Sequence, residues 1–108
     1  MEIIFHAHHA AITPRLRQRA DTSIRKIVAR LGRVVDAVVR VEEDGPTRRV
    51  ELVLHAARGR RLVAHGEGRA FGPALTVALG RLSTQVAHAK RSRSAAAKSR
   101  ARRKLLTA

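Results

Sequence analysis

The chain has 108 residues, of which 44% are hydrophobic, so one domain with a buried core is possible. Lys and Arg number 23 against 8 Asp and Glu, and the formal net charge of +15 indicates a polyanionic partner, either nucleic acid or an anionic membrane. The lack of cysteine excludes disulfides, Cys-based zinc sites and cysteine nucleophiles, and the two aromatic residues exclude base stacking on several rings.

The N-terminal third predicts a strand followed by a helix. Residues 2–8 alternate in side-chain character, which is typical of a short strand. Thr13 and Pro14 are typical of a helix start, because Thr caps free amides and Pro suits the first helical position. The helix is expected to reach about Leu31, with Gly32 as its stop. Its predicted apolar stripe consists of Leu16, Ala20, Ile24, Ile27 and Leu31.

Three further strands are predicted at residues 34–43, 48–57 and 60–67, separated by sequences typical of turns. Each alternates between an apolar and a polar face, which favours a sheet with one wet side. The predicted inward residues are Val35, Ala37, Val39 and Val41, then Val50, Leu52, Leu54 and Ala56, and finally Leu62, Ala64 and Gly66.

A second helix is predicted from about Gly72-Pro73 to at least Lys90, with an apolar stripe that includes Leu75, Leu82 and Val86. The order β-α-β-β-β-α predicts an α+β fold, in which two helices pack on one face of a four-stranded sheet, as in double-stranded-RNA-binding folds. The first strand–helix–strand unit should be a parallel crossover.

The charge distribution predicts a division of the chain into a domain at residues 1–93 and a basic tail at residues 94–108. Residues 90–108 hold eight Lys and Arg residues and no acid. Such a segment is either a disordered arm or an extension of the second helix.

The basic residues of the two helices form ridges, which we interpret as a surface for RNA phosphates. On the first helix the ridge residues are spaced by 4, 7 and 4 positions, with no acid among them. The candidate RNA-binding residues are Arg15, Arg19, Lys26 and Arg30 on the first helix, and Arg81, His88, Lys90, Arg91 and Arg93 on or after the second. The alternative is a solvated basic surface without function.

The histidines and acids give no sign of a metal site or of catalysis. His6 and His8 share one face of the first strand, and His55 and His65 are expected to meet on the outer face of the sheet. No Cys or acid accompanies them in the spacing of a metal site. Since no phosphate loop and no nucleophile elbow occurs, we expect a protein that is not an enzyme, without cofactor or small-molecule substrate.

Several short strings follow one another in an order that is characteristic of a known family. They are Ile4-Phe5-His6-Ala7-His8-His9, Ile12-Thr13-Pro14-Arg15-Leu16, Ile24-Arg25-Lys26-Ile27, Ala64-His65-Gly66-Glu67-Gly68, Ala74-Leu75, Arg81-Leu82 and Gln85. Over residues 1–93 the chain resembles the ribosome hibernation-promoting factors, also called ribosome-associated inhibitor A or protein Y and formerly sigma-54 modulation proteins. It departs from the family pattern at Ala7, Ser23, Ala70, Gly72 and Thr76, where Gly, Lys, Asp, Tyr and Asp are usual.

The resemblance implies a cytoplasmic, non-enzymatic factor that binds 16S rRNA of the small (30S) ribosomal subunit, also within the 70S ribosome. Such factors occupy the decoding channel for tRNA and mRNA and inhibit translation in stationary phase or stress. Because the sequence ends at residue 108, we expect a short form without its own dimerisation domain.

Two alternatives stay open at the level of the sequence. A basic nucleoid-type protein that binds DNA or RNA would share the charge, although no apolar wedge residues on an extended arm are visible. A membrane-surface role is disfavoured, because Leu105-Leu106 is the sole apolar anchor of the tail and no run approaches the roughly 20 apolar residues of a membrane span.

Overall fold

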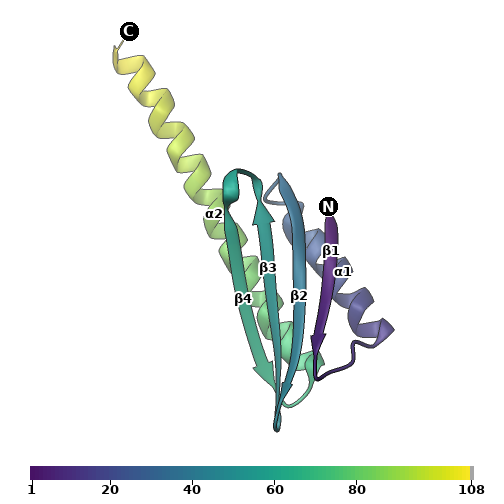
Figure 1. Cartoon of the computed structure of the whole chain (residues 1–108). Coiled ribbons are helices and arrows are strands. Elements are labelled where there is room, and N and C mark those ends of the chain that lie inside the picture. Colours follow the sequence, from purple (N-terminus) through teal and green to yellow (C-terminus); the bar gives the residue numbers. More distant parts are fainter. Residues whose placement is uncertain (108) are drawn as a thin grey trace.

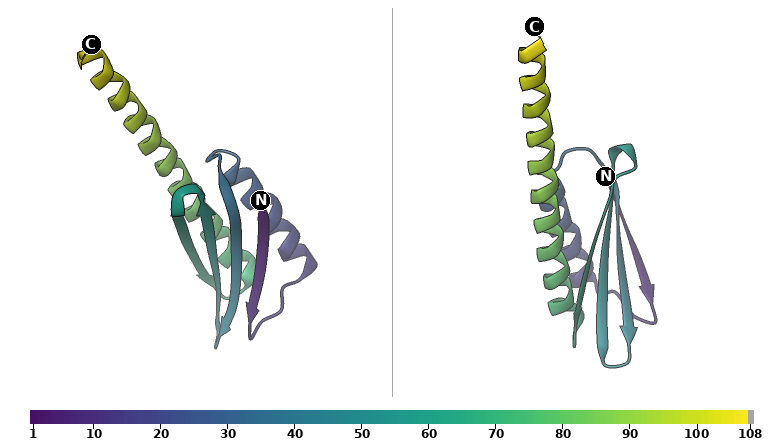
Figure 2. Two further views of the ribbon diagram at one scale, coloured as in Figure 1. Left: turned by 45° about the horizontal axis from the view of Figure 1, so that its top comes forward. Right: turned by 90° about the vertical axis from the view of Figure 1, so that its left-hand side faces the viewer.

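The computed structural model describes the backbone of residues 1–107 and the side chains of residues 1–91. In chain order its elements are β1 (Glu2–His8), α1 (Pro14–Val28), β2 (Val34–Asp44), β3 (Thr47–Ala56), a 3₁₀ turn (Ala57–Gly59), β4 (Arg61–Gly68) and α2 (Phe71–Thr107). The strands form one sheet in the order β1-β2-β3-β4, in which β1 is parallel to β2 and the other pairs are antiparallel. Both helices lie on one face of the sheet (Figures 1 and 2). The predicted α+β architecture and its parallel first pair are confirmed.

Helix α1 begins as predicted but ends earlier than predicted. The Thr13 side chain accepts a hydrogen bond from the Leu16 amide at 3.2 Å, and Pro14 takes the first helical position. The prediction of a helix to Leu31 is wrong, because the amides of Leu31 and Gly32 both turn back to the carbonyl of Val28. Gly32 has a φ of +90°, which glycine adopts without steric cost. Leu31 still reaches the core, so its apolar periodicity outlasts the regular helix.

The core lies between the sheet and the two helices, where the sequence pattern placed it. Its largest fully buried side chains are Ile24, Leu52, Leu54, Leu75, Leu82, Val41, Val50 and Val86. Helix α2 begins at Phe71, one residue before the predicted start. The apolar stripes of both helices therefore close the inner face of the sheet.

Val35 was expected inside and is 62% exposed. The pairing of β2 with β3 shifts register between Val34 and Asp36, so one extra residue interrupts the alternation at this end of the strand. Val34 packs against the core in its place. From Ala37 onward the predicted inward residues of β2 are buried.

The outer face of the sheet carries cross-strand rows of side chains. Ile4, Val38, Val53 and Val63 form an apolar row, since each lies opposite the next in the strand pairing. The prediction that His55 and His65 meet is wrong. The pairing of β3 with β4 places His65 opposite Glu51, to which its Nε2 lies at 2.9 Å, whereas His55 contacts Asp36.

Helix α2 continues past the sheet to Thr107 (Figure 1). The side chains of the predicted tail, residues 94–108, lie outside the described residues, so the division at residue 93 stays a prediction. Shortening the chain to residues 1–93 should leave the melting temperature within about 3 °C of the full chain, because the tail has no apolar periodicity with which to dock. Calorimetry of the two chains would show this, and a shortened chain that melts well below the full one would contradict it.

Candidate nucleic-acid interface

The basic ridge of α1 lies on the flank of that helix that faces α2. Arg19 contacts α2 directly, and Arg15 and Lys26 lie four and seven positions away, on the same side of the helix. Arg15, Lys26 and Arg30 are exposed, and within the described part of the chain none of their side chains has a hydrogen-bond or ion-pair partner. Arg30 lies two positions beyond Val28, the last residue of α1, so it belongs to the turn after the helix and not, as predicted, to the helix itself. These three cations are available to an external anion.

Arg19 has a structural role that the sequence did not indicate. Its guanidinium donates to the Gly72 carbonyl at 3.0 Å and to Thr76 Oγ1 at 2.5 Å, which ties α1 to the first two turns of α2. Thr76 Oγ1 in turn donates to the Gly72 carbonyl at 3.1 Å. Arg19 therefore fixes the spacing of the two helices at their N-terminal ends.

Arg17 and Arg25 leave the ridge, as their positions in the sequence predict. The Arg17 guanidinium carbon lies 4.6 Å from the centroid of the Phe5 ring, within the range of a cation–π contact. Arg25 Nε donates to Asp21 Oδ1 at 2.7 Å, and Arg25 Nη1 lies 3.4 Å from the Met1 carbonyl. Both side chains therefore contact the protein itself on the side of α1 that faces β1.

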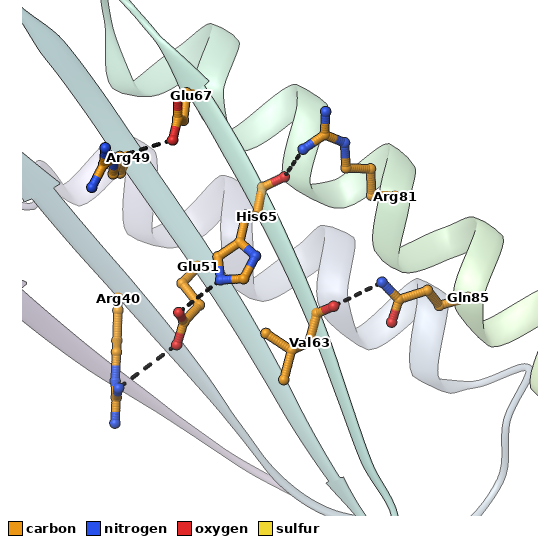
Figure 3. A network of polar contacts seen from close by, with 8 residues as sticks. All are labelled: Arg40, Arg49, Glu51, Val63, His65, Glu67, Arg81 and Gln85. Atoms are coloured by element: carbon orange, nitrogen blue, oxygen red, sulfur yellow. Dashed lines mark hydrogen bonds and ion pairs between the residues drawn. The ribbon is translucent and has the colours of Figure 1, made fainter.

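Two α2 side chains cover the free edge of the sheet at β4 (Figure 3). Arg81 Nη1 donates to the His65 carbonyl at 2.8 Å, and Gln85 Nε2 donates to the Val63 carbonyl at 2.7 Å. These carbonyls have no neighbouring strand on that side, and the two donors satisfy them while blocking pairing with another chain. The signal that sequence reasoning missed is the Arg81, Gln85 pair four positions apart on a helix that follows an edge strand.

The contact of Arg81 with β4 predicts that this residue contributes to stability. Replacing Arg81 by Ala should lower the free energy of unfolding by about 1 kcal/mol, since a charged group loses its hydrogen bond to a backbone carbonyl. Replacing Arg91 by Ala should cost less than about 0.5 kcal/mol, because its exposed side chain has no hydrogen-bond or ion-pair partner among the described residues. Urea unfolding of both variants measures the difference, and equal stabilities would mean that the edge contact is not needed.

The remaining candidates lie on or after α2. His88, Lys90 and Arg91 are exposed, and the side chain of Arg93 lies outside the described residues. His88 follows Arg81 by seven positions and therefore shares the β4 side of α2. Between Arg81 and the ridge of α1 lies a shallow strip of α2, lined by small uncharged residues that include Thr76, Gly80 and Thr84. Thr76 contacts Arg19 of α1, so Arg81 and His88 lie on the side of this strip away from α1. Arg91 follows the strip itself, seven positions after Thr84.

The charges of the molecule are divided between its two layers. Residues 14–30 and 71–91 contain nine Lys and Arg residues and one acid, Asp21. The other seven acids are all in strands: Glu2, Asp36, Glu42, Glu43, Asp44, Glu51 and Glu67. Several pair with sheet cations, as in Arg49–Glu67 at 3.1 Å and Arg48–Glu43 at 2.9 Å. The helix segments therefore carry a net charge of +8, whereas the rest of residues 1–91 carries +1.

Neither metal ligands nor a membrane span is found in the part of the chain that the structure describes. No group of three or more His, Cys, Asp or Glu side chains among these residues converges as metal ligation requires. No helix described here combines the length and apolar character needed to cross a membrane.

Comparison with known proteins gives a consistent picture. No curated protein sequence matches the chain. A ribosomal subunit interface protein from Coxiella burnetii has a similar structure, with a TM-score of 0.77 at 16% identity over 84% of this chain and 99% of that one. The N-terminal domain of Protein Y from Thermus thermophilus has a TM-score of 0.65 at 22% identity, over 79% of this chain and 91% of that one. Both likenesses support the fold.

The family model described as "Sigma 54 modulation protein / S30EA ribosomal protein" matches residues 3–94, nearly the whole domain. This match covers every string on which the resemblance was based, and it confirms that resemblance. The chain belongs to the sigma 54 modulation protein / S30EA ribosomal protein family.

Proposed function

We propose that this protein is a non-enzymatic factor that binds the small (30S) ribosomal subunit, both free and within the 70S ribosome. It would bind 16S rRNA in the channel for tRNA and mRNA, and so inhibit translation in the cytoplasm during stationary phase or stress. The family and the names of the two similar structures, a ribosomal subunit interface protein and Protein Y, support this proposal.

The observation that carries the proposal is the division of charge between the layers. RNA carries regularly spaced phosphates with condensed counterions. Lys and Arg side chains without partners release these counterions from the RNA when they bind the phosphates, which favours binding. The helix layer offers exposed side chains on both of its helices: Arg15, Lys26 and Arg30 on or next to α1, and His88 and Arg91 on α2. Of the four Lys and Arg residues in the described strands, three are paired with acids: Arg40, Arg48 and Arg49. We therefore propose that the helix layer faces the rRNA.

The test measures co-sedimentation of the full chain with purified small subunits. A triple variant, Arg15→Ala with Lys26→Ala and Arg30→Ala, should bind at least about tenfold more weakly, since it removes three charge-assisted contacts. Its matched control, Arg40→Ala with Arg49→Ala and Arg61→Ala, removes the same charge from the outer face of the sheet and should bind almost normally. Equal losses in both variants would show that the helix layer is not the interface.

Two further readouts separate this proposal from the nucleoid-type alternative. Duplex DNA should compete poorly for the protein against small subunits, and the protein should inhibit translation in a reconstituted system. Equal affinity for duplex DNA and for subunits, without inhibition, would favour the nucleoid-type protein.

A further inference from the structure

An open groove of ≈ 420 Å³ lies between the N-terminal ends of α1 and α2, next to the basic ridge. It is lined by Ala11, Thr13, Arg15, Leu16, Arg19, Phe71 and Gly72. Its volume falls within the range of about 300–1,000 Å³ that is usual for small-ligand sites. The ribosome-binding proposal above does not use it.

The walls of the groove are largely apolar. Leu16 and Phe71 line it, and both are partly buried and packed against the core, which holds them in place. Phe71 is one of two aromatic residues in the chain, and the Arg48 guanidinium carbon lies 6.0 Å from the centroid of its ring. A flat apolar group can therefore pack against Leu16 and Phe71 without any rearrangement of these side chains.

Two arginine side chains border these walls, one already bound within the protein and one without a partner among the described residues. Arg19 is held by the Gly72 carbonyl and Thr76 Oγ1, so it forms a fixed side of the groove. Arg15 is exposed and, among the described residues, has no partner for its side chain. The groove thus combines an apolar wall with a cation that is free to bind an anion.

The missing side chain at Gly72 keeps the groove open. A Cβ atom added there would meet no other atom within 4 Å, and the backbone of Gly72 does not require glycine. A large side chain at this position can therefore occupy the groove without disturbing the core. The same is true of Gly80, which lies two turns further along α2 and outside the groove.

We propose that this groove holds one unstacked nucleotide of the bound RNA, with its base against Leu16 and Phe71 and its phosphate at Arg15. The inference rests on the proposed function, because it assumes that RNA is the partner. Charge complementarity favours this occupant: the groove opens beside a ridge of cations, and apolar walls next to a free arginine match a base joined to a phosphate. Single nucleotides that leave the stack are commonly bound in this way, on an aromatic ring or an arginine plane.

The test titrates the ¹⁵N-labelled full chain with AMP and UMP, and with ribose 5-phosphate as the probe that lacks a base. We expect the amides of residues 13–16 and 71–72 to shift, with at least about fivefold weaker binding of ribose 5-phosphate, since base stacking supplies the difference. Gly72→Phe should abolish the response, whereas Gly80→Phe, a matched insertion at an open helical glycine, should keep it.

The outcomes are decisive in both directions. Shifts that disappear in Gly72→Phe and persist in Gly80→Phe support the nucleotide site. No shift with either nucleotide, equal binding of ribose 5-phosphate, or shifts that survive Gly72→Phe would overturn it, as would stronger binding of N-acetyl-leucinamide, which stands for a protein side chain. Failure of the wild-type chain to sediment with small subunits would instead remove the proposed function, so the two failures are distinguishable.

Discussion

Replacing Gly66 by Ala is expected to lower the melting temperature by about 10 °C or more. Strand β4 passes so close to α2 at this point that an added Cβ would lie 2.0 Å from the Ala74 carbonyl oxygen and 2.7 Å from the Ala78 amide nitrogen. Both are backbone atoms, which cannot swing aside as a side chain does. The helix must therefore move away from the sheet, at a cost of about 3 kcal/mol, the upper part of the usual range for overpacking.

Two other glycines serve as controls for this substitution. At Gly68 the nearest atom to an added Cβ is at 3.5 Å, an ordinary contact, so Gly68→Ala should change little. At Gly80 there is no atom within 4 Å, and Gly80→Ala should raise stability by roughly 0.5–1 kcal/mol, because alanine favours the helix. Calorimetry of the three variants gives the comparison. A Gly66→Ala protein that melts close to the wild type would contradict the close approach of β4 and α2.

The order of elements and most of the core could be predicted, because each depends on local periodicity. Val50, Leu52 and Leu54 alternate along β3 and are all buried in the structure. The identity of Gly66 as an inward residue was predicted in the same way, and it is buried. The sequence did not predict that this residue must be glycine, because that requirement depends on how closely α2 approaches β4.

Two of the errors in the fold, the inward Val35 and the late end of α1, have a common physical cause. The register shift that turns Val35 outward depends on the pairing of β2 with β3, and alternation along one strand cannot show it. The early end of α1 depends on the positive φ of Gly32 and on amides that turn back to Val28. In both places the apolar pattern continues through a backbone irregularity, so the pattern alone indicates a regular element.

For the candidate site too, local features could be predicted from the sequence and long-range contacts could not. Exposure of Arg15 and Lys26 follows from helical spacing and was predicted, and Arg30 is exposed although it lies in the turn after α1. The binding role of all three stays a prediction. The contacts of Arg19 and Arg81 were not predicted, because each guanidinium donates to a backbone carbonyl more than ten residues away. Charge and spacing in the sequence predict a basic flank. The tertiary fold determines which of its cations already bind groups within the protein.

Affinity for small subunits should fall about 10³-fold between 50 and 200 mM salt. This estimate assumes about six phosphate contacts and the scale known for duplex DNA, on which each neutralised phosphate releases counterions. The number is close to the five Lys and Arg side chains of the helix layer that are exposed and have no partner among the described residues: Arg15, Lys26, Arg30, Lys90 and Arg91. Co-sedimentation across a series of salt concentrations yields the slope of log affinity against log salt.

The salt slopes of charge-removal variants show which cations contact the rRNA. Removing Arg15, Lys26 and Arg30 together should reduce the slope by about 3, because each contact contributes slightly less than one unit. Removing Arg40, Arg49 and Arg61 changes the net charge equally and should leave the slope unchanged, since these cations lie on the outer face of the sheet. The comparison therefore separates local contacts from a general effect of charge. A wild-type slope near zero, or equal reductions in both triple variants, would mean that the cations of the helix layer do not bind rRNA phosphates.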